Sequence, residues 1–217
     1  MTTYQEQELE TIRIKVFEMA DLAIESINRS VESLKKSDIK LAEEVIHRDN
    51  LLDKLEMTVD EECIKFLATK QPAATDLRLV LALIKINTDL ERIGDLSTNI
   101  AKETIRLSGK PTLKPLVDIP RMAATTIQMI KDSFLAISEK NPEKARDVIE
   151  RDNQIDDLNT QIYRELISYM VENPNTIGQA LGLIMVAKAL ERIGDHATNI
   201  SEKAVYYIEG EDIRHQS

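Results

Sequence analysis

Two short segments of this 217-residue chain carry the same pair of acids at the same spacing. The first reads LERIGDLSTNIAKE from Leu90, and the second reads LERIGDHATNISEK from Leu190. In each segment a glutamate precedes an aspartate by four residues, and an asparagine follows four residues later. Residues four apart share one face of a helix, so each segment presents two carboxylates and an amide in a row. Clustered carboxylates are the ligands that hard cations prefer.

A second pair of acids precedes each of these segments. VIHRDNLLDKLE begins at Val45 and VIERDNQIDDLN begins at Val148, and each contains a DxxxD block. Several bridging acids favour a site that holds more than one metal ion. The predicted ligands are Asp49, Asp53, Glu91 and Asp95 in the first half of the chain, and Asp152, Asp156, Glu191 and Asp195 in the second. Asn99 and Asn199 are possible additional oxygen ligands, with a hydrogen bond on the helix surface as the alternative.

The elements that must position these blocks are long helices separated by prolines. Low aromatic content, the absence of Trp and abundant Leu, Ile, Ala, Glu and Lys favour an all-α fold. The six prolines fall between segments with helical periodicity, where a helix must begin or end. Ser37 or Asp38 is a candidate N-cap, and Pro142 suits a first helical position after Asn141. Six helices are predicted, at residues 3–35, 38–69, 74–108, 120–139, 142–171 and 175–208.

The repeat extends over three successive segments of each half. MADLAIESI from Met19 parallels MAATTIQMI from Met122, in addition to the two acidic blocks. Self-similarity of this extent predicts two tandem, pseudo-symmetric three-helix bundles. The predicted domains are residues 1–109 and 120–217, joined by a linker of about 110–119.

The four acids of each half should lie at one level of their bundle. In the first half the block midpoints, residues 51 and 93, each lie 21 residues from the turn at Pro72. On antiparallel helices that rise about 1.5 Å per residue, both blocks are about 30 Å from that turn. The acids flank the apolar stripes, which predicts clusters on the rim, open to solvent. Gly94 and Gly194 are predicted to allow close helix approach beside the acids.

Like charges at this spacing repel, so a partner must offset the repulsion. Metal ions are one possibility. The other is a metal-free structural bundle, in which Arg48, Arg92, Arg151 and Arg192 make interhelical ion pairs with the same acids. His196 faces about 100° away from Asp195 on a helix, so it is predicted to contact solvent or a partner rather than a metal.

A di-metal enzyme on a helical bundle is a further alternative. Such an enzyme needs an open coordination position in an enclosed pocket and a group that moves protons. A rim site made only of acids argues against it, and no catalytic residue is predicted.

Composition excludes several classes of partner. The formal net charge of −10 argues against nucleic acid, whose phosphates require clustered Lys and Arg. No apolar run approaches the roughly 20 residues of a membrane helix, and the acidic, polar N-terminus does not resemble a signal peptide. Cys63 is predicted to be a small buried hydrophobe. These features predict a cytoplasmic protein.

With two copies of LERIGD followed by TNI, each preceded by RDN and a further Asp, the chain resembles the PhoU family over nearly its whole length. The resemblance implies two similar three-helix bundles, with iron, zinc, magnesium or manganese held by the eight acids. One departure, GDLSTN in the first copy against GDHATN in the second, suggests unequal metal affinity.

The same resemblance implies a role and partners. It implies a negative regulator of the phosphate-starvation response that links the ATPase subunit of a phosphate ABC transporter to a membrane sensor histidine kinase. Such a protein would be peripheral to a membrane complex without spanning the membrane. A homodimer is expected.

Overall fold

The computed structural model describes residues 4–213, and all regular structure in that range is helical. Its elements are α1 (Tyr4–Lys36), α2 (Ile39–Thr69), α3 (Ala74–Leu107), α4 (Asp118–Glu139), α5 (Pro142–Glu172), the short 3-10 helix η1 (Pro174–Thr176) and α6 (Ile177–Glu209). The all-α prediction with six long helices is confirmed. The predicted ends agree with those observed to within two residues, although predicted residue 3 lies outside the described range.

Local capping explains why two of these helices begin where they do. The side chain of Asp38 accepts a hydrogen bond from the Leu41 amide, which selects Asp38 rather than Ser37 as the N-cap of α2. Asn141 caps α5 in the same way, and Pro142 occupies the first turn. These caps satisfy amides that have no partner inside the helix.

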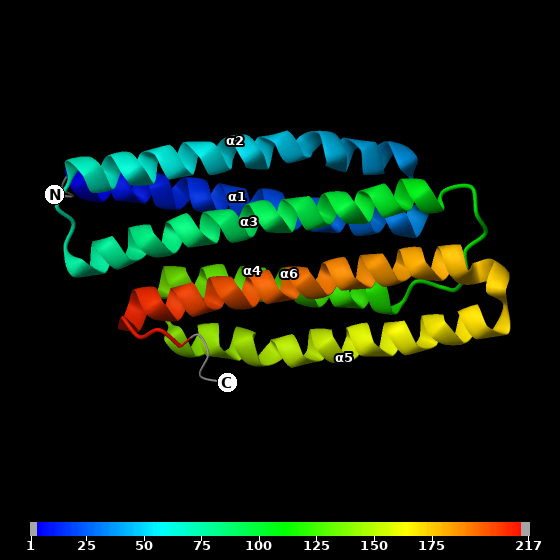
Figure 1. The fold of residues 1–217 in the computed structure, drawn as a ribbon. Helices are drawn as coiled ribbons and strands as arrows, with labels where there is room; N and C mark the ends of the chain where they lie inside the picture. The colour runs from blue at the N-terminus through cyan, green and yellow to red at the C-terminus, as the bar shows by residue number, and fades with distance from the viewer. Residues whose placement is uncertain (1–3, 214–217) are drawn as a thin grey trace.

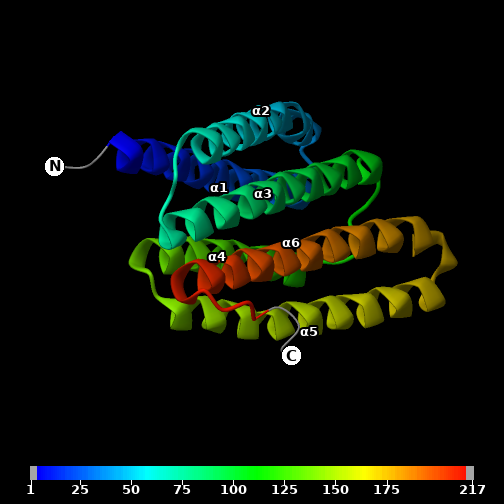
Figure 2. The same cartoon turned by 60° about the vertical axis from the view of Figure 1, so that its left-hand side comes forward.

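The six helices form two three-helix units, α1–α3 and α4–α6. Figure 1 shows α3 and α6 side by side between the units and running in opposite directions, with α1 and α4 behind them. The view in Figure 2 shows the same two units from another side. Contacts along this seam pair rising residue numbers on α3 with falling numbers on α6, so the two copies are related by a pseudo-twofold axis. The contacts are Arg78 with the Tyr207 carbonyl, Asp89 with His196, and Arg106 with the Gly178 carbonyl.

One apolar core runs through both units. It contains an apolar stripe of α3, including Leu83, Leu90 and Ile93, together with Leu190 and Ile193 of α6. Between α1 and α4, the rings of Phe17 and Phe134 meet edge to face with centroids 4.9 Å apart. The two units therefore hold the acidic helices in a common rigid frame.

Residues 108–117 join the units. Lys114 is buried in this segment, where it pairs with Glu165 of α5 and lies 3.6 Å from Asp118. Asp118 and Ile119 belong to α4, whereas the sequence places them in the linker. None of the helices in residues 4–213 combines the length and the apolar character of a membrane span.

Candidate metal-binding site

The eight predicted acids lie in two groups, one between α2 and α3 and one between α5 and α6. In every block the first acid is half-buried and the second is exposed. Glu91 is 19% exposed and Asp95 is 50% exposed, for example. We call the first group (Asp49, Asp53, Glu91, Asp95) cluster 1 and the second (Asp152, Asp156, Glu191, Asp195) cluster 2. Each cluster therefore has an inner pair of carboxylates against the bundle and an outer pair in solvent.

The glycine beside each cluster allows the helices to approach closely at the level of the acids. A Cβ atom added to Gly94 would lie 2.6 Å from Leu52 Cδ1 and 2.8 Å from Asp49 Oδ1. At Gly194 the corresponding distance to Asp152 Oδ1 is 3.1 Å. The structure thus agrees with the predicted close approach, and it places the DxxxD and ExxxD blocks at one level.

The acids of cluster 1 perturb one another. Burial raises the pKa of the Asp49 carboxyl, and the charges of Asp53 and Asp95 raise it further, while the adjacent Thr98 hydroxyl opposes the shift. Burial also raises the pKa of Glu91, with Asp95 as the next cause. These directions are those expected when like charges share a partly desolvated site.

Glu56 is a member of this neighbourhood that the repeat did not predict. Its pKa is raised by burial and then by Asp60 and Asp53. Glu56 follows Asp53 by three residues on α2, so helical spacing alone would have placed it beside the block. The equivalent residue of the second copy is Asn159, which is why a search for repeated acids misses Glu56.

Cluster 2 is the more strongly perturbed of the two. Burial, followed by the charges of Asp195, Asp156 and Glu191, raises the pKa of Asp152 to about 6. Burial also raises the pKa of Asp195, with Glu191 and Asp156 as the next causes. A cation beside Asp152 would reverse both effects, since it favours the charged carboxylate.

Several buried oxygen atoms around the clusters have no hydrogen-bond partner among residues 4–213. In cluster 1 this atom is Glu91 Oε2. Around cluster 2 the atoms are Asp152 Oδ1, Glu191 Oε2 and Thr198 Oγ1. Thr198 lies one helical turn after Gly194, the glycine that is next to Asp152. In the first unit the equivalent threonine, Thr98, donates a hydrogen bond to the Gly94 carbonyl. Unpartnered buried acceptors are rare in proteins, and here they are oxygen atoms of the kind that hard cations bind.

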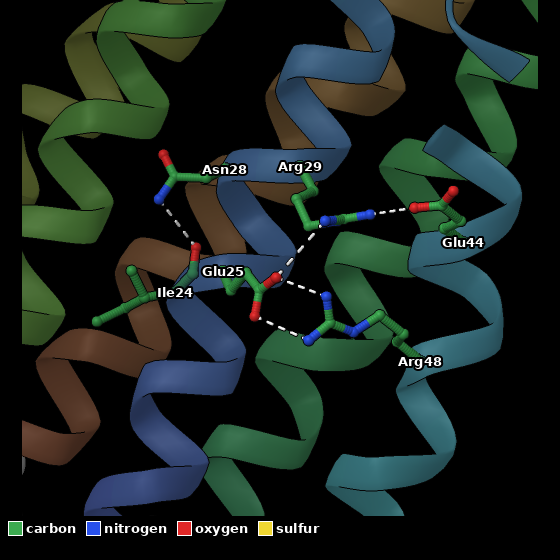
Figure 3. Close-up of polar contacts among 6 residues, drawn as sticks. All are labelled: Ile24, Glu25, Asn28, Arg29, Glu44 and Arg48. Atoms are coloured by element: carbon green, nitrogen blue, oxygen red, sulfur yellow. Dashed lines mark hydrogen bonds and ion pairs between the residues drawn. The ribbon is translucent and has the colours of Figure 1, made fainter. Parts of the chain in front are cut away.

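The arginines that precede the DxxxD blocks are directed away from the clusters. Arg48 donates two hydrogen bonds to Glu25 of α1, at 2.5 and 2.9 Å, as Figure 3 shows. Arg29 lies between Glu25 and Glu44 in the same network. In the second unit Arg151 pairs with Asp132 of α4 at 2.6 Å. Arg48 and Arg151 therefore do not make the ion pairs with the clusters that the metal-free alternative predicts.

The arginines of the ExxxD blocks contribute little more. Arg92 lies 3.3 Å from Glu91 and 3.4 Å from Asp95, but these contacts stay within α3. Arg192 makes no ion pair with any described residue. In cluster 2, Lys188 pairs with Oε1 of Glu191, again within one helix. The interhelical ion pairs of the metal-free alternative are thus not found in the described part of the chain.

His196 and Asn199 hold the two units together. His196 Nδ1 lies 2.8 Å from Asp89 Oδ1 of α3, and Asn199 Nδ2 donates to the same oxygen at 3.3 Å. His196 was predicted to contact solvent or a partner, and this is wrong because α6 packs on α3 at that position. The role of Asp89 was not predicted. A comparison of the two copies could have pointed to it, because Asp89 and His196 are polar where their equivalents, Ala189 and Leu96, are apolar. Asn99 is exposed.

In the side-chain conformations of this structure, the acids do not converge. Within residues 4–213, no group of three or more His, Cys, Asp or Glu side chains is arranged to hold a metal ion. Metal binding would require the carboxylates of a cluster to rotate toward one another. The donor set still fits a hard cation, because each cluster offers four carboxylates, and cluster 2 adds buried oxygen atoms without a hydrogen-bond partner among the described residues.

Comparison with known proteins supports this architecture. A family model described as the PhoU domain matches residues 16–104 and again residues 119–204. The phosphate-specific transport system accessory protein PhoU homolog of Aquifex aeolicus is 42% identical over 210 residues, which cover 97% of this chain and 95% of that protein. The homolog from Rhizobium meliloti is 39% identical, over 94% of this chain and 86% of that protein.

Two solved structures are similar over almost the whole fold. The crystal structure of PhoU from Pseudomonas aeruginosa matches with a TM-score of 0.90 and 34% identity, over 94% of this chain and 99% of that one. PhoU from Streptococcus pneumoniae, a phosphate transport system regulatory protein, matches with a TM-score of 0.90 and 25% identity, over 96% and 98% of the two chains.

Proposed function

Because this chain belongs to the PhoU family, we propose that it is an accessory protein of a phosphate transport system and a regulator of phosphate uptake. Relatives that match it over 95% and 86% of their length are described as phosphate-specific transport system accessory proteins, and solved structures named PhoU share its fold. They are described as accessory or regulatory proteins rather than as enzymes.

The clusters are the proposed metal sites. The observation that carries this is the set of buried oxygen atoms of cluster 2 that have no partner in residues 4–213. A cation would satisfy these atoms and offset the repulsion that raises the pKa of Asp152. Asp49, Asp53, Glu91 and Asp95 would hold ions in cluster 1, and Asp152, Asp156, Glu191 and Asp195 would hold them in cluster 2. Iron, zinc, magnesium and manganese are the candidates.

The proposed mechanism is that of an adaptor. The acidic faces, with or without metal, would dock on a basic surface of the transporter's ATPase subunit and on a membrane sensor histidine kinase, at the cytoplasmic side of the membrane. To repress the phosphate-starvation response, the adaptor must bind the inactive or phosphatase state of the kinase more tightly than the active state. A homodimer is part of this proposal.

Elemental analysis tests the metal sites. The protein would be purified without added metal or affinity chelation, beside a variant with Glu91, Asp95, Glu191 and Asp195 changed to Ala. We expect bound metal in the first protein and none in the second. A matched control changes four exposed acids away from the clusters (Glu43, Glu61, Asp147 and Glu172) and should keep the metal. If the parent protein stays metal-free after incubation with iron, manganese and magnesium, the clusters are only charged surfaces.

A reconstituted signalling assay tests the adaptor role. Autophosphorylation and dephosphorylation of the histidine kinase would be followed with the transporter present, with and without this protein. We expect less phosphorylated kinase when the protein is added. Unchanged rates in both directions would refute the adaptor mechanism while leaving the metal sites untouched.

A further inference from the structure

An apolar groove continues from cluster 2 toward the turn between α5 and α6. It has a volume of about 600 Å³ and is lined by Asn159, Thr160, Tyr163, Arg164, Ile167, Ile184, Met185 and Lys188. Tyr163 is 51% exposed and Met185 is 59% exposed. Beyond the groove the apolar stripe continues with Val171 on α5 and Leu181 on α6. Contiguous exposed apolar surface of this kind typically marks an interaction site.

The internal repeat supplies a comparison within the same molecule. At the equivalent positions of the first unit, Asp60 replaces Tyr163 and Lys85 replaces Met185. Glu56 and Glu61 replace Asn159 and Arg164. The first unit carries charged residues at all four positions. Glu61 and Lys85 are exposed there, while Glu56 and Asp60 are half-buried and Asp60 accepts a hydrogen bond from Asn87. Folding therefore does not require the apolar residues of the second unit.

Cluster 2 and the apolar groove lie along the same pair of helices, α5 and α6, and Lys188, which lines the groove, pairs with Glu191 of cluster 2. We call this combined surface the channel. On α5, Asp152, Asp156, Tyr163, Ile167 and Val171 follow one another at steps of four or seven residues, which keeps them on one face. At about 1.5 Å per residue this row is about 30 Å long. Four carboxylates lie at one end of the row. The groove beyond them is mainly apolar, with Arg164 and Lys188 as its two cations.

We propose that this channel binds an amphipathic helix of a partner protein, about 20 residues long, with its apolar face in the groove and basic residues at the end that lies over cluster 2. An apolar helix face laid into a groove between two helices is a recurring mode of peptide recognition. The charge gradient along the channel selects the basic end and fixes the direction of the bound helix.

Charge also argues against the other occupants. A second copy of this chain, with a formal net charge of −10, offers an acidic surface rather than the basic residues that cluster 2 attracts, so the proposed homodimer would use another face. An anionic lipid surface would be repelled by the carboxylates that border the groove.

A designed peptide tests the proposal with the full-length, metal-free protein. The probe is a 20-residue helical peptide with Leu at i, i+3, i+4 and i+7 repeats and three Lys residues at one end. We expect it to bind at least tenfold more tightly than a scrambled peptide or one in which Lys is replaced by Glu. Tyr163→Asp with Met185→Lys, which copies the first unit, should weaken binding at least tenfold. Met57→Lys, the same change at an exposed site of the first unit, should not.

Each result has a defined meaning. Equal binding of the ordered and scrambled peptides, or an unaffected double variant, overturns the proposal. Sedimentation that shows a dimer lost in the double variant assigns the groove to a second copy, and flotation with anionic vesicles lost in that variant assigns it to lipid. Either outcome also overturns it. Because the double variant keeps all eight acids, it should retain metal, which separates this test from that of the metal sites.

Discussion

At the scale of single residues, the clusters are sites where folding leaves like charges unneutralised. Asp152 shows this most clearly, because burial and three neighbouring acids raise its pKa from 3.8 to about 6. Between these two pH values the folded state binds more protons than the unfolded state. The carboxylate of Asp152 therefore lowers the free energy of unfolding above pH 6, and this destabilisation disappears as the pH falls to 4.

Asp152→Asn should consequently stabilise the metal-free protein at neutral pH. We expect the free energy of unfolding to rise by about 1 kcal/mol at pH 7, since one pKa unit corresponds to about 1.4 kcal/mol and the site is partly screened by solvent. The difference from the parent protein should vanish near pH 4. Urea unfolding of both proteins at each pH, in the presence of a chelator, measures this difference in the free energy of unfolding. Asp147→Asn, at an exposed position on the same helix, is the control, and a destabilised Asp152→Asn protein at pH 7 would contradict the argument.

The residue scale is also where sequence reasoning was least complete. The spacing of four residues predicted that the two acids of each block share one helix face. It did not predict which acids the arginines pair with. Arg48 pairs with Glu25 and Arg151 with Asp132, and these two acids occupy different positions of the repeat. A side chain selects among several nearby acids by three-dimensional distance, which helical periodicity does not contain.

At the scale of elements, local chemistry made the helices predictable. Prolines and the caps Asp38 and Asn141 act on the chain within a few residues, so the helix ends could be placed from the sequence. The contacts between α3 and α6 could not be predicted from the sequence, because they depend on how one unit docks on the other. The Asp89–His196 contact uses positions at which the two copies differ.

The close approach of neighbouring helices predicts different effects at the two repeated glycines. Alanine at Gly94 would press on Leu52, which is buried, as well as on Asp49. We expect Gly94→Ala to lower the free energy of unfolding by about 1 kcal/mol, because overpacking outweighs the gain in helix propensity. At Gly194 the nearest atoms are 3.1 and 3.3 Å from the added Cβ, so Gly194→Ala should stay within about 0.5 kcal/mol of the parent protein. Urea titration of both variants measures this, and equal losses would count against it.

At the scale of the whole molecule, duplication produced one frame with two unlike faces. The common core and the antiparallel seam keep the units nearly symmetric. The two units differ at their surfaces. Tyr163 and Met185 line an apolar groove of the second unit, and His196 of that unit pairs with Asp89 of the first unit across the seam. A repeat preserved in its core and altered on its surface is expected when the two copies contact different partners.

The same asymmetry predicts the order in which the clusters fill with metal. Around cluster 2, three buried oxygen atoms have no hydrogen-bond partner in the described chain, and Lys188 pairs only with Oε1 of Glu191. In cluster 1 there is one such atom, Glu91 Oε2, and it lies 3.3 Å from Arg92. A cation gains more where it relieves more repulsion, so we expect cluster 2 to bind Mn²⁺ about tenfold more tightly. Calorimetric titration of two variants measures this: Asp53→Asn with Asp95→Asn disables cluster 1, and Asp156→Asn with Asp195→Asn disables cluster 2. All four changed residues are exposed, so both variants should fold. The tighter site should survive only in the first variant, and its survival in the second would reverse the assignment.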